Sequence, residues 1–176
     1  MTAQTSSSSS PSTYHVFLSF RGKDSAKAFI GHLHQALDRV GYRTFLEEDD
    51  DDGIERDEIR SKLEKAIMKS RMSIIVFSKG YASSTRCLDE VVMILQHKRT
   101  CSDPHHVLPV FYDVEPTDVK KQTGSFKEAF KRYEERLRAK EGERKYDWTS
   151  KLAGWKEALK EAANLAGMDL KHQANG

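Results

Sequence analysis

The stretch FRGKDS, residues 20–25, contains residue types that suit the binding of a phosphate group. Gly22 has no side chain and allows the backbone to approach a ligand closely. Asp24 or Ser25 is placed to cap a helix that follows, and the first backbone N–H groups of a helix favour an anion. The sequence therefore predicts a phosphate-binding loop at these residues.

A second candidate for chemistry is the carboxylate of Glu90, within a predicted helix. The apolar stripe of that helix consists of Leu88, Val91, Val92 and Leu95. At about 100° per residue, Glu90 points well over a right angle from the centre of the stripe, so we expect it to face off the core. Ser83 and Ser84 are candidate N-caps, which places Glu90 where the helix dipole favours a carboxylate. A solvated surface glutamate fits the same pattern, and periodicity alone leaves both roles open.

Alternating strands and helices must position these residues. Short apolar runs predict strands at 14–20, 42–46, 72–78 and 106–114, and a fifth edge strand at 167–170. Helical spacing predicts helices at 24–41, 57–70 and 87–98, followed by two charged helices that carry Phe126 to Leu137 and Leu152 to Ala162. Apolar strands separated by helices indicate a parallel sheet covered on both faces. We expect an α/β fold, an open doubly wound sandwich.

Ligands of such folds bind outside the carboxyl ends of the strands, where the strand order reverses. If the order is 2-1-3-4, the crevice opens between the loop at 20–25 and the loop at 78–86, which reads SKGYASSTR. Glu90 follows the second loop directly. The sequence therefore predicts that Glu90 stands beside the ligand crevice.

Length and charge exclude several classes of function. The 176 residues fit one domain. We expect a disordered Ser-rich segment at 1–13, a folded domain at 14–170 and a flexible tail at 171–176. A net charge of +2 gives no global basic field, so a nucleic-acid partner is not expected.

The two cysteines, Cys87 and Cys101, have neither a CxxC spacing nor a nearby Cys/His cluster. The sequence therefore indicates neither a disulfide framework nor a zinc site, and fits a reducing compartment. The N-terminus lacks the pattern of a secretory signal, and no apolar run reaches the length of a membrane span. We expect a cytoplasmic protein, with the nucleus as a second compartment and no membrane partner.

Several motifs, in order and at the expected spacing, resemble the plant Toll/interleukin-1 receptor (TIR) domain of the disease-resistance type. They are YHVFLSFRGKDS, YRTFL, SIIVFSKGYASS, CLDEV, VLPVFYDVEPTDVKKQTGSFKEAF and WKEALKEAANLAG. The resemblance runs from about residue 14 to 170 and implies a flavodoxin-like fold of five parallel strands. It also implies a role in innate immune signalling and hydrolysis of NAD at the nicotinamide–ribose bond on self-association.

The resemblance assigns roles to particular residues. The glutamate after Cys-Leu-x is the catalytic one, which maps onto Glu90. A carboxylate near the ribose can stabilise the oxocarbenium-like cation and hold the ribose hydroxyls. NAD(P) is then the substrate, and no tightly bound cofactor is implied. The residues expected to bind the nucleotide are Phe20, Arg21, Gly22, Lys23, Asp24, Ser25, Gly53, Ser84 and Arg86.

The side-chain chemistry of two of these positions also fits a role other than nucleotide binding. Arg21 could offset pyrophosphate charge or form a surface ion pair, and Ser84 could touch ribose or act only as the helix cap.

The chain departs from the family pattern at three positions. Arg86 stands where the family usually carries Trp, one helical turn before Glu90 and on the same side. It could pair with Glu90 and block the site, receive a phosphate, or form only a weak exposed ion pair. In the loop after the second strand the family has Arg-Gly before Glu-Ile, whereas this chain has ERDEI and an earlier glycine, Gly53. The family's Ser-His contact between copies reads Gly31-His32 here, which weakens the expected interface.

The acidic loop invites a metal interpretation, because Glu48, Asp50, Asp52 and Gly53 approximate the start of an EF-hand loop. The twelfth position, however, is Ile59 instead of a bidentate glutamate. We therefore expect a solvated loop and no metal site, with at most weak association of Mg²⁺ or Ca²⁺.

Two classes of function fit these observations. The first is an NAD-cleaving enzyme that uses Glu90. The second is a non-catalytic assembly module that signals through homotypic TIR contacts, including the helix of His32, and accepts other TIR proteins as partners. A phospho-receiver is excluded because Arg21 and Ser78 occupy the places of its acidic residues. A classical dehydrogenase is excluded because the chain has no GxGxxG motif.

Overall fold

The computed structural model of the chain describes residues 13–46 and 56–170. The predicted Ser-rich segment up to residue 12, the acidic loop with Gly53, and the predicted tail at 171–176 lie outside the described residues.

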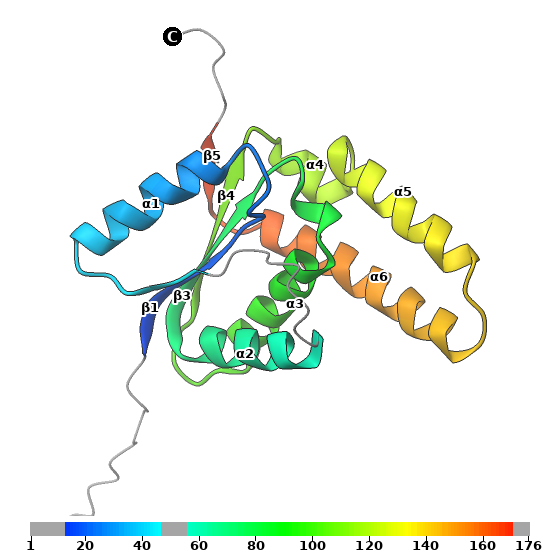
Figure 1. The fold of residues 1–176 in the computed structure, drawn as a ribbon, viewed down its shortest axis with the longest axis horizontal. Helices are drawn as coiled ribbons and strands as arrows, with labels where there is room; N and C mark the ends of the chain where they lie inside the picture. Colours follow the sequence, from blue (N-terminus) through cyan, green and yellow to red (C-terminus); the bar gives the residue numbers. More distant parts are fainter. Residues whose placement is uncertain (1–12, 47–55, 171–176) are drawn as a thin grey trace, which may run out of the picture.

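The described residues contain one parallel sheet with the strand order β2-β1-β3-β4-β5 (Figure 1). The strands are β1 Tyr14–Ser19, β2 Thr44–Phe45, β3 Ser70–Phe77, β4 His106–Tyr112 and β5 Met168–Leu170. Five parallel strands and the expected edge strand at the end of the chain are confirmed. The second strand is shorter than the predicted 42–46, because only two of its residues pair with β1.

Helices cover both faces of the sheet. Their bounds are α1 Lys27–Arg39, α2 Arg56–Met68, α3 Thr85–Thr100, α4 Pro116–Lys121, α5 Ser125–Arg138 and α6 Glu143–Ala163, with a short 3-10 helix, η1, at Tyr81–Ser83. Val16 and Leu18 of β1 point into the core beneath α1, whereas Phe17 points into the larger core with residues of α2, α3 and α6. This alternation along a strand follows from its period of two. The prediction of a doubly wound sandwich is confirmed (Figure 1).

The prediction of two helices after the fourth strand is wrong, because three are present. The additional helix, α4, begins with Pro116 at its first position, where a missing N–H costs no hydrogen bond. It ends at Gln122, whose left-handed φ of 49° stops the helix, and α5 begins at Ser125. The helix α4 is only six residues long, too short for periodicity to reveal, and the predicted helix that carries Phe126 to Leu137 corresponds to α5.

The sheet brings the loops after β1 and β3 together. Ser19, the last residue of β1, lies beside Ile75 of β3 in the parallel register. From β1 the chain continues to β2 on one side, while β3 and β4 lie on the other side, so the strand order reverses between β1 and β3. The predicted crevice position, between the first and third loops, is therefore the switch point of this sheet.

Candidate functional site

The start of α3 is fixed by a side-chain cap. Ser84 has an extended backbone (φ −102°, ψ 115°), and its hydroxyl accepts a hydrogen bond from the backbone N–H of Cys87 at 3.2 Å. The prediction that this serine caps the helix is confirmed. The cap fixes where the helix begins and so places Glu90 within its second turn.

The prediction that Glu90 faces off the core is wrong. Glu90 is only 3% exposed, as buried as the apolar residues around it. The helix α3 packs against α2 and α6 as well as against the sheet, and its buried residues include Met93 and Ile94, which lie off the predicted stripe. A helix covered on several sides buries residues far from the centre of its stripe, and this is the physical reason for the error.

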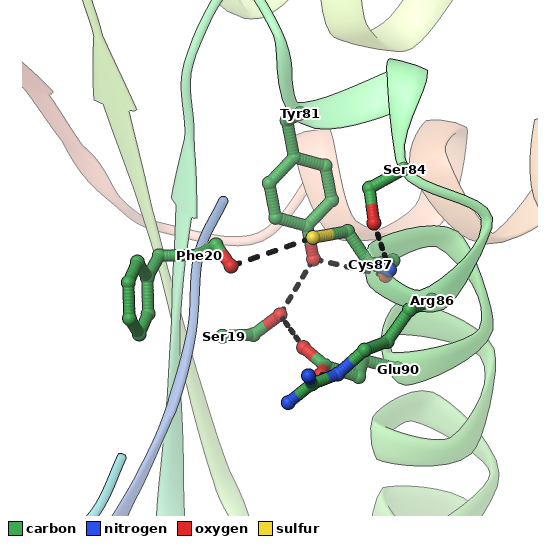
Figure 2. A network of polar contacts seen from close by, with 7 residues as sticks. All are labelled: Ser19, Phe20, Tyr81, Ser84, Arg86, Cys87 and Glu90. Carbon is green, nitrogen blue, oxygen red and sulfur yellow. Dashed lines mark hydrogen bonds and ion pairs between the residues drawn. The ribbon is translucent and has the colours of Figure 1, made fainter. Parts of the chain in front are cut away.

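Both oxygens of the Glu90 carboxylate have hydrogen-bond donors (Figure 2). The hydroxyl of Ser19, at the end of β1, donates to Oε2, and Nε of Arg86 donates to Oε1 at 3.2 Å. Figure 2 shows both side chains pointing toward the carboxylate, one from the strand and one from the helix. The carboxylate is thus held in one orientation at the carboxyl end of β1.

A second layer of contacts holds Ser19 in place. The Tyr81 hydroxyl lies 2.7 Å from Ser19 Oγ and donates to the carbonyl oxygen of Cys87 at 3.1 Å. The thiol of Cys87 lies 3.4 Å from the carbonyl oxygen of Phe20 (Figure 2). The end of β1, the 3-10 helix and the first turn of α3 therefore form one connected unit around Glu90.

The ion pair between Arg86 and Glu90 confirms one of the alternatives that the sequence left open. Its environment differs from the exposed pair expected, because the two side chains are 18% and 5% exposed. Charge interactions strengthen as water is excluded, so the attraction between the two groups is stronger than in a surface pair, although burial of both charges carries a desolvation cost. Arg86 therefore covers one oxygen of Glu90 in this structure.

The loop at residues 20–25 is tied to the loop after β3 rather than capping α1. The predicted caps are wrong: the helix begins after Ala26, whose methyl group cannot accept a hydrogen bond. The carboxylate of Asp24 instead accepts from the Ser78 hydroxyl and from the backbone N–H of Gly80, at 3.0 Å in the second case. The guanidinium of Arg21 donates to the Gly80 carbonyl at 2.9 Å. These bonds fix the two sides of the crevice relative to each other.

The family model described as "TIR domain" matches residues 13–176. The chain belongs to the TIR domain family.

Relatives of this TIR domain include plant proteins. The chain is 46% identical over 179 residues to "Disease resistance protein RPV1" of Vitis rotundifolia, a match that covers 97% of this chain and 12% of that protein. It is 42% identical over 163 residues to "TMV resistance protein N" of Nicotiana glutinosa, covering 92% of this chain and 13% of that protein. The TIR domain thus spans about an eighth of the length of these relatives.

A solved structure supports the fold assignment. The TIR domains in "Structure of the activated Roq1 resistosome directly recognizing the pathogen effector XopQ" match with a TM-score of 0.73 and 44% identity. The match covers 93% of this chain and 92% of that chain. The expected flavodoxin-like TIR fold is therefore confirmed.

The other predicted nucleotide-binding residues of this TIR domain lie in different environments. Lys23 and Ser25 are exposed in the first loop, whereas Gly22 is buried. The Phe20 side chain is also buried, in the core beneath α1, and its ring points away from Glu90 in Figure 2. Phe20 therefore presents its backbone, and not its ring, to the site.

Sequence reasoning missed three residues that surround Glu90: Ser19, Tyr81 and Cys87. One signal is present in the sequence, because Ser19 is a polar residue at the end of an otherwise apolar strand. A buried hydroxyl needs a partner, and here the partner is the carboxylate. The positions of Tyr81 and Cys87 depend on how η1 joins α3, which periodicity does not reveal.

Two expected absences concern metals and membranes. Across residues 13–46 and 56–170, no group of three or more His, Cys, Asp or Glu side chains is arranged to hold a metal ion. Within the same described ranges, no helix combines the length and the apolar character needed to cross a bilayer. Glu48, Asp50 and Asp52, which approximate the start of an EF-hand loop, lie outside these ranges.

Gly80 allows the two loops of the TIR domain to pack closely. A Cβ atom at this position would lie 2.6 Å from the Arg21 guanidinium and 2.8 Å from the Asp24 carboxylate. We expect Gly80→Ala to lower the free energy of unfolding by about 1 kcal/mol, since both neighbours are side-chain ends that can shift. Urea unfolding monitored by tryptophan fluorescence measures the change.

A matched control for Gly80 is Gly154, an exposed glycine within α6 where an added methyl group would meet no atom within 4 Å. Gly154→Ala should raise the free energy of unfolding by about 0.5–1 kcal/mol, because alanine favours the helix. Equal stabilisation by Gly80→Ala would show that the two loops are not packed as described.

Proposed function

We propose that this TIR domain hydrolyses NAD at the nicotinamide–ribose bond in plant innate immune signalling, with Glu90 as the catalytic carboxylate. The observation that carries the proposal is the buried carboxylate of Glu90 at the switch point of the sheet, oriented by Ser19 and Arg86. The relatives support the setting, since they are named as plant disease-resistance proteins. Buried carboxylates rarely occur without a structural or catalytic reason.

The chemistry requires a negative charge and no strong base. Nicotinamide leaves as a neutral group, and the ribose left behind carries oxocarbenium-like positive charge. A fixed carboxylate in a water-poor site stabilises that charge more strongly than one in bulk water, because the dielectric constant is lower. Ser19 keeps one carboxylate oxygen in place, so little reorganisation is needed during bond cleavage.

Arg86 must release Glu90 for this chemistry to occur. Its guanidinium donates a hydrogen bond to Oε1 of Glu90. We propose that this oxygen faces the ribose when the substrate is bound. A paired guanidinium neutralises the charge that the cation needs. We infer that binding of NAD, or assembly of several copies, shifts Arg86 away from the carboxylate.

The nucleotide portion of NAD(P) is assigned to the first loop. Arg21 supplies positive charge for the pyrophosphate, and Lys23 and Ser25 are exposed on the same loop. Asp24 holds the first loop in place and does not contact the ligand, because its carboxylate already accepts hydrogen bonds from Ser78 and Gly80. NAD is the substrate, and the proposal includes no tightly bound cofactor.

A second candidate function is a non-catalytic assembly module. The pairing of Arg86 with Glu90 favours it, because the carboxylate is neutralised in this structure. A matched TIR structure comes from an activated resistosome, and we propose that this chain also forms homo-oligomers through TIR contacts. Gly31 and His32 lie exposed on α1, where a copy of the domain or another TIR protein could pack.

The proposal also includes the cellular compartment in which the protein acts. We place the protein in the cytoplasm, with the nucleus as a second compartment, since Cys87 and Cys101 are both present as thiols rather than in a disulfide.

The catalytic proposal predicts that activity rises more steeply than protein concentration. If assembly releases Glu90, doubling the protein concentration should raise the rate of nicotinamide release more than twofold, and about fourfold if pairs are the active species. Chromatographic measurement of nicotinamide at several protein concentrations tests this, with light scattering to record the oligomeric state. A strictly proportional rate while the oligomeric state changes would contradict activation by assembly.

A further inference from the structure

A pocket of about 350 Å³ lies beside the site described above and does not include Glu90 among its lining residues. It is lined by Arg21, Ser83, Arg132, Tyr133 and Arg136. These residues come from three elements: the loop after β1, the 3-10 helix η1, and α5, which packs against η1. The pocket therefore lies where segments far apart in the sequence converge, close to the carboxyl end of β1.

The arginines of this pocket are not ion-paired with carboxylates of the described residues. Arg21 donates to the Gly80 carbonyl, and Arg132 donates to the Ser83 hydroxyl at 3.0 Å. Both partners are neutral. The Asp24 carboxylate lies close to Arg21, since both would contact a Cβ atom at Gly80, but it forms no ion pair with it and is bonded to Ser78 and Gly80. Arg132 and Arg136 therefore bring two guanidinium charges to the hollow that no carboxylate of the described residues pairs with.

The acidic residues of α5 form no ion pair with these arginines. Glu135, the residue before Arg136, has no ion pair among the described residues. Glu134 is engaged by Lys156 at 2.7 Å. Glu128 lies one turn before Arg132, yet no ion pair joins them in the part of the chain that the structure describes. Protein surfaces usually intersperse charges of both signs, so three arginines at one cavity, none of them ion-paired among the described residues, indicate a site for an anionic ligand.

The geometry of the cluster suits phosphate. Arg132 and Arg136 are four residues apart on one helix, which places them on the same face one turn apart. A planar guanidinium forms two parallel hydrogen bonds to phosphate oxygens, and two neighbouring forks can hold a diphosphate.

Tyr133 provides the inner wall of the pocket. Its hydroxyl donates to the Ala82 carbonyl at 2.8 Å. Burial raises the pKa of Tyr133, while the positive charges of Arg136, Arg132 and Arg21 act against that increase. All three arginines are therefore close enough to act electrostatically on this hydroxyl.

We propose that this arginine pocket is a binding site for the phosphate groups of a nucleotide. A volume of about 350 Å³ is at the small end for ligand pockets, so it fits a diphosphate with part of a nucleoside better than a whole dinucleotide. The phosphates could belong to the NAD substrate, whose pyrophosphate would then extend from Arg21 toward α5, or to a second nucleotide bound beside it. Binding itself does not depend on Glu90 or on cleavage.

Titration of the full chain with inorganic pyrophosphate tests the site without requiring activity. We expect saturable binding by calorimetry at low salt, and a loss of about tenfold or more in affinity for Arg132→Gln/Arg136→Gln, since two charge-assisted contacts are removed. The matched control is Lys131→Gln/Arg138→Gln, which removes the same charge from exposed positions of the same helix outside the pocket. The control should bind within about twofold of the wild type.

Three results would overturn the proposal. These are no binding by the wild type, equal weakening by both double variants, and loss of binding only through unfolding, which thermal melting would reveal. Equal weakening of pyrophosphate affinity would mean that binding depends only on the net charge of the helix and not on the pocket.

Competition with NAD separates the two sources of phosphate. If the pocket holds the pyrophosphate of the substrate, NAD displaces inorganic pyrophosphate, and Arg132→Gln/Arg136→Gln weakens NAD binding. If it holds a second nucleotide, NAD and pyrophosphate bind together and NAD affinity is unchanged. Either result supports the arginine pocket, and both can be read even if the wild type releases no nicotinamide.

Discussion

Replacing Glu90 with glutamine is expected to reduce nicotinamide release from NAD by about 10²- to 10³-fold, the effect of removing one fixed charge-stabilising group. Glutamine has the same shape, so its amide oxygen can accept from Arg86 and its NH2 group can donate to the Ser19 hydroxyl, but it carries no negative charge for the ribose cation. Initial rates of nicotinamide release at equal oligomeric state measure the effect. Glu128→Gln on α5, an exposed position, should leave the rate unchanged.

The choice of glutamine follows from the burial of Glu90. Alanine at this position would leave the Arg86 guanidinium and the Ser19 hydroxyl without their shared partner. Removing one member of a buried pair costs about 3 kcal/mol, so Glu90→Ala should lose stability as well as activity. Thermal melting separates the two effects. Full cleavage by a folded Glu90→Gln protein would show that the carboxylate is structural.

Replacing Arg86 with tryptophan is expected to increase nicotinamide release about tenfold, the factor that about 1.4 kcal/mol gives. The increase has two sources. Losing the guanidinium frees Oε1 of Glu90 from a hydrogen bond between charged groups, which is worth about 1.5–3 kcal/mol. The indole ring restores the aromatic surface that the family usually carries at this position, against which a base can stack.

Arg86→Met separates these two sources, because methionine frees Glu90 without supplying an aromatic ring. Both variants should release nicotinamide faster than the wild type, and tryptophan should exceed methionine. Rates are compared at equal concentrations of folded protein, since losing Arg86 also removes a partner of a buried carboxylate. A fall in rate for both variants would show that Arg86 contacts the substrate and is not a barrier.

The arrangement of the sheet could be predicted because it depends on local patterns. Apolar runs such as HVFLS and SIIVF are short and β-branched or aromatic, and helical stretches with one apolar face separate them. These patterns determine parallel pairing and place the carboxyl ends of β1 and β3 at one edge. The location of the crevice follows from strand order alone, without knowledge of side-chain contacts.

The interior of the site could not be predicted, because it depends on contacts between distant segments. Glu90 is buried where α3 lies against the end of β1, and its partner Ser19 is 71 positions away in the sequence. Asp24 has the residue type of a helix cap but bonds to a loop 54 and 56 positions away. Residue type indicated that these groups need partners, whereas only the tertiary structure identifies the partners.

The most direct test of the central claim is the rate of nicotinamide release from NAD by the wild-type chain and Glu90→Gln. Both are measured at high protein concentration, with assembly monitored by light scattering. The catalytic account predicts steady release by the assembled wild type and almost none by Glu90→Gln. An assembled wild type that releases no more nicotinamide than Glu90→Gln would contradict catalysis by Glu90 and favour a non-catalytic assembly module.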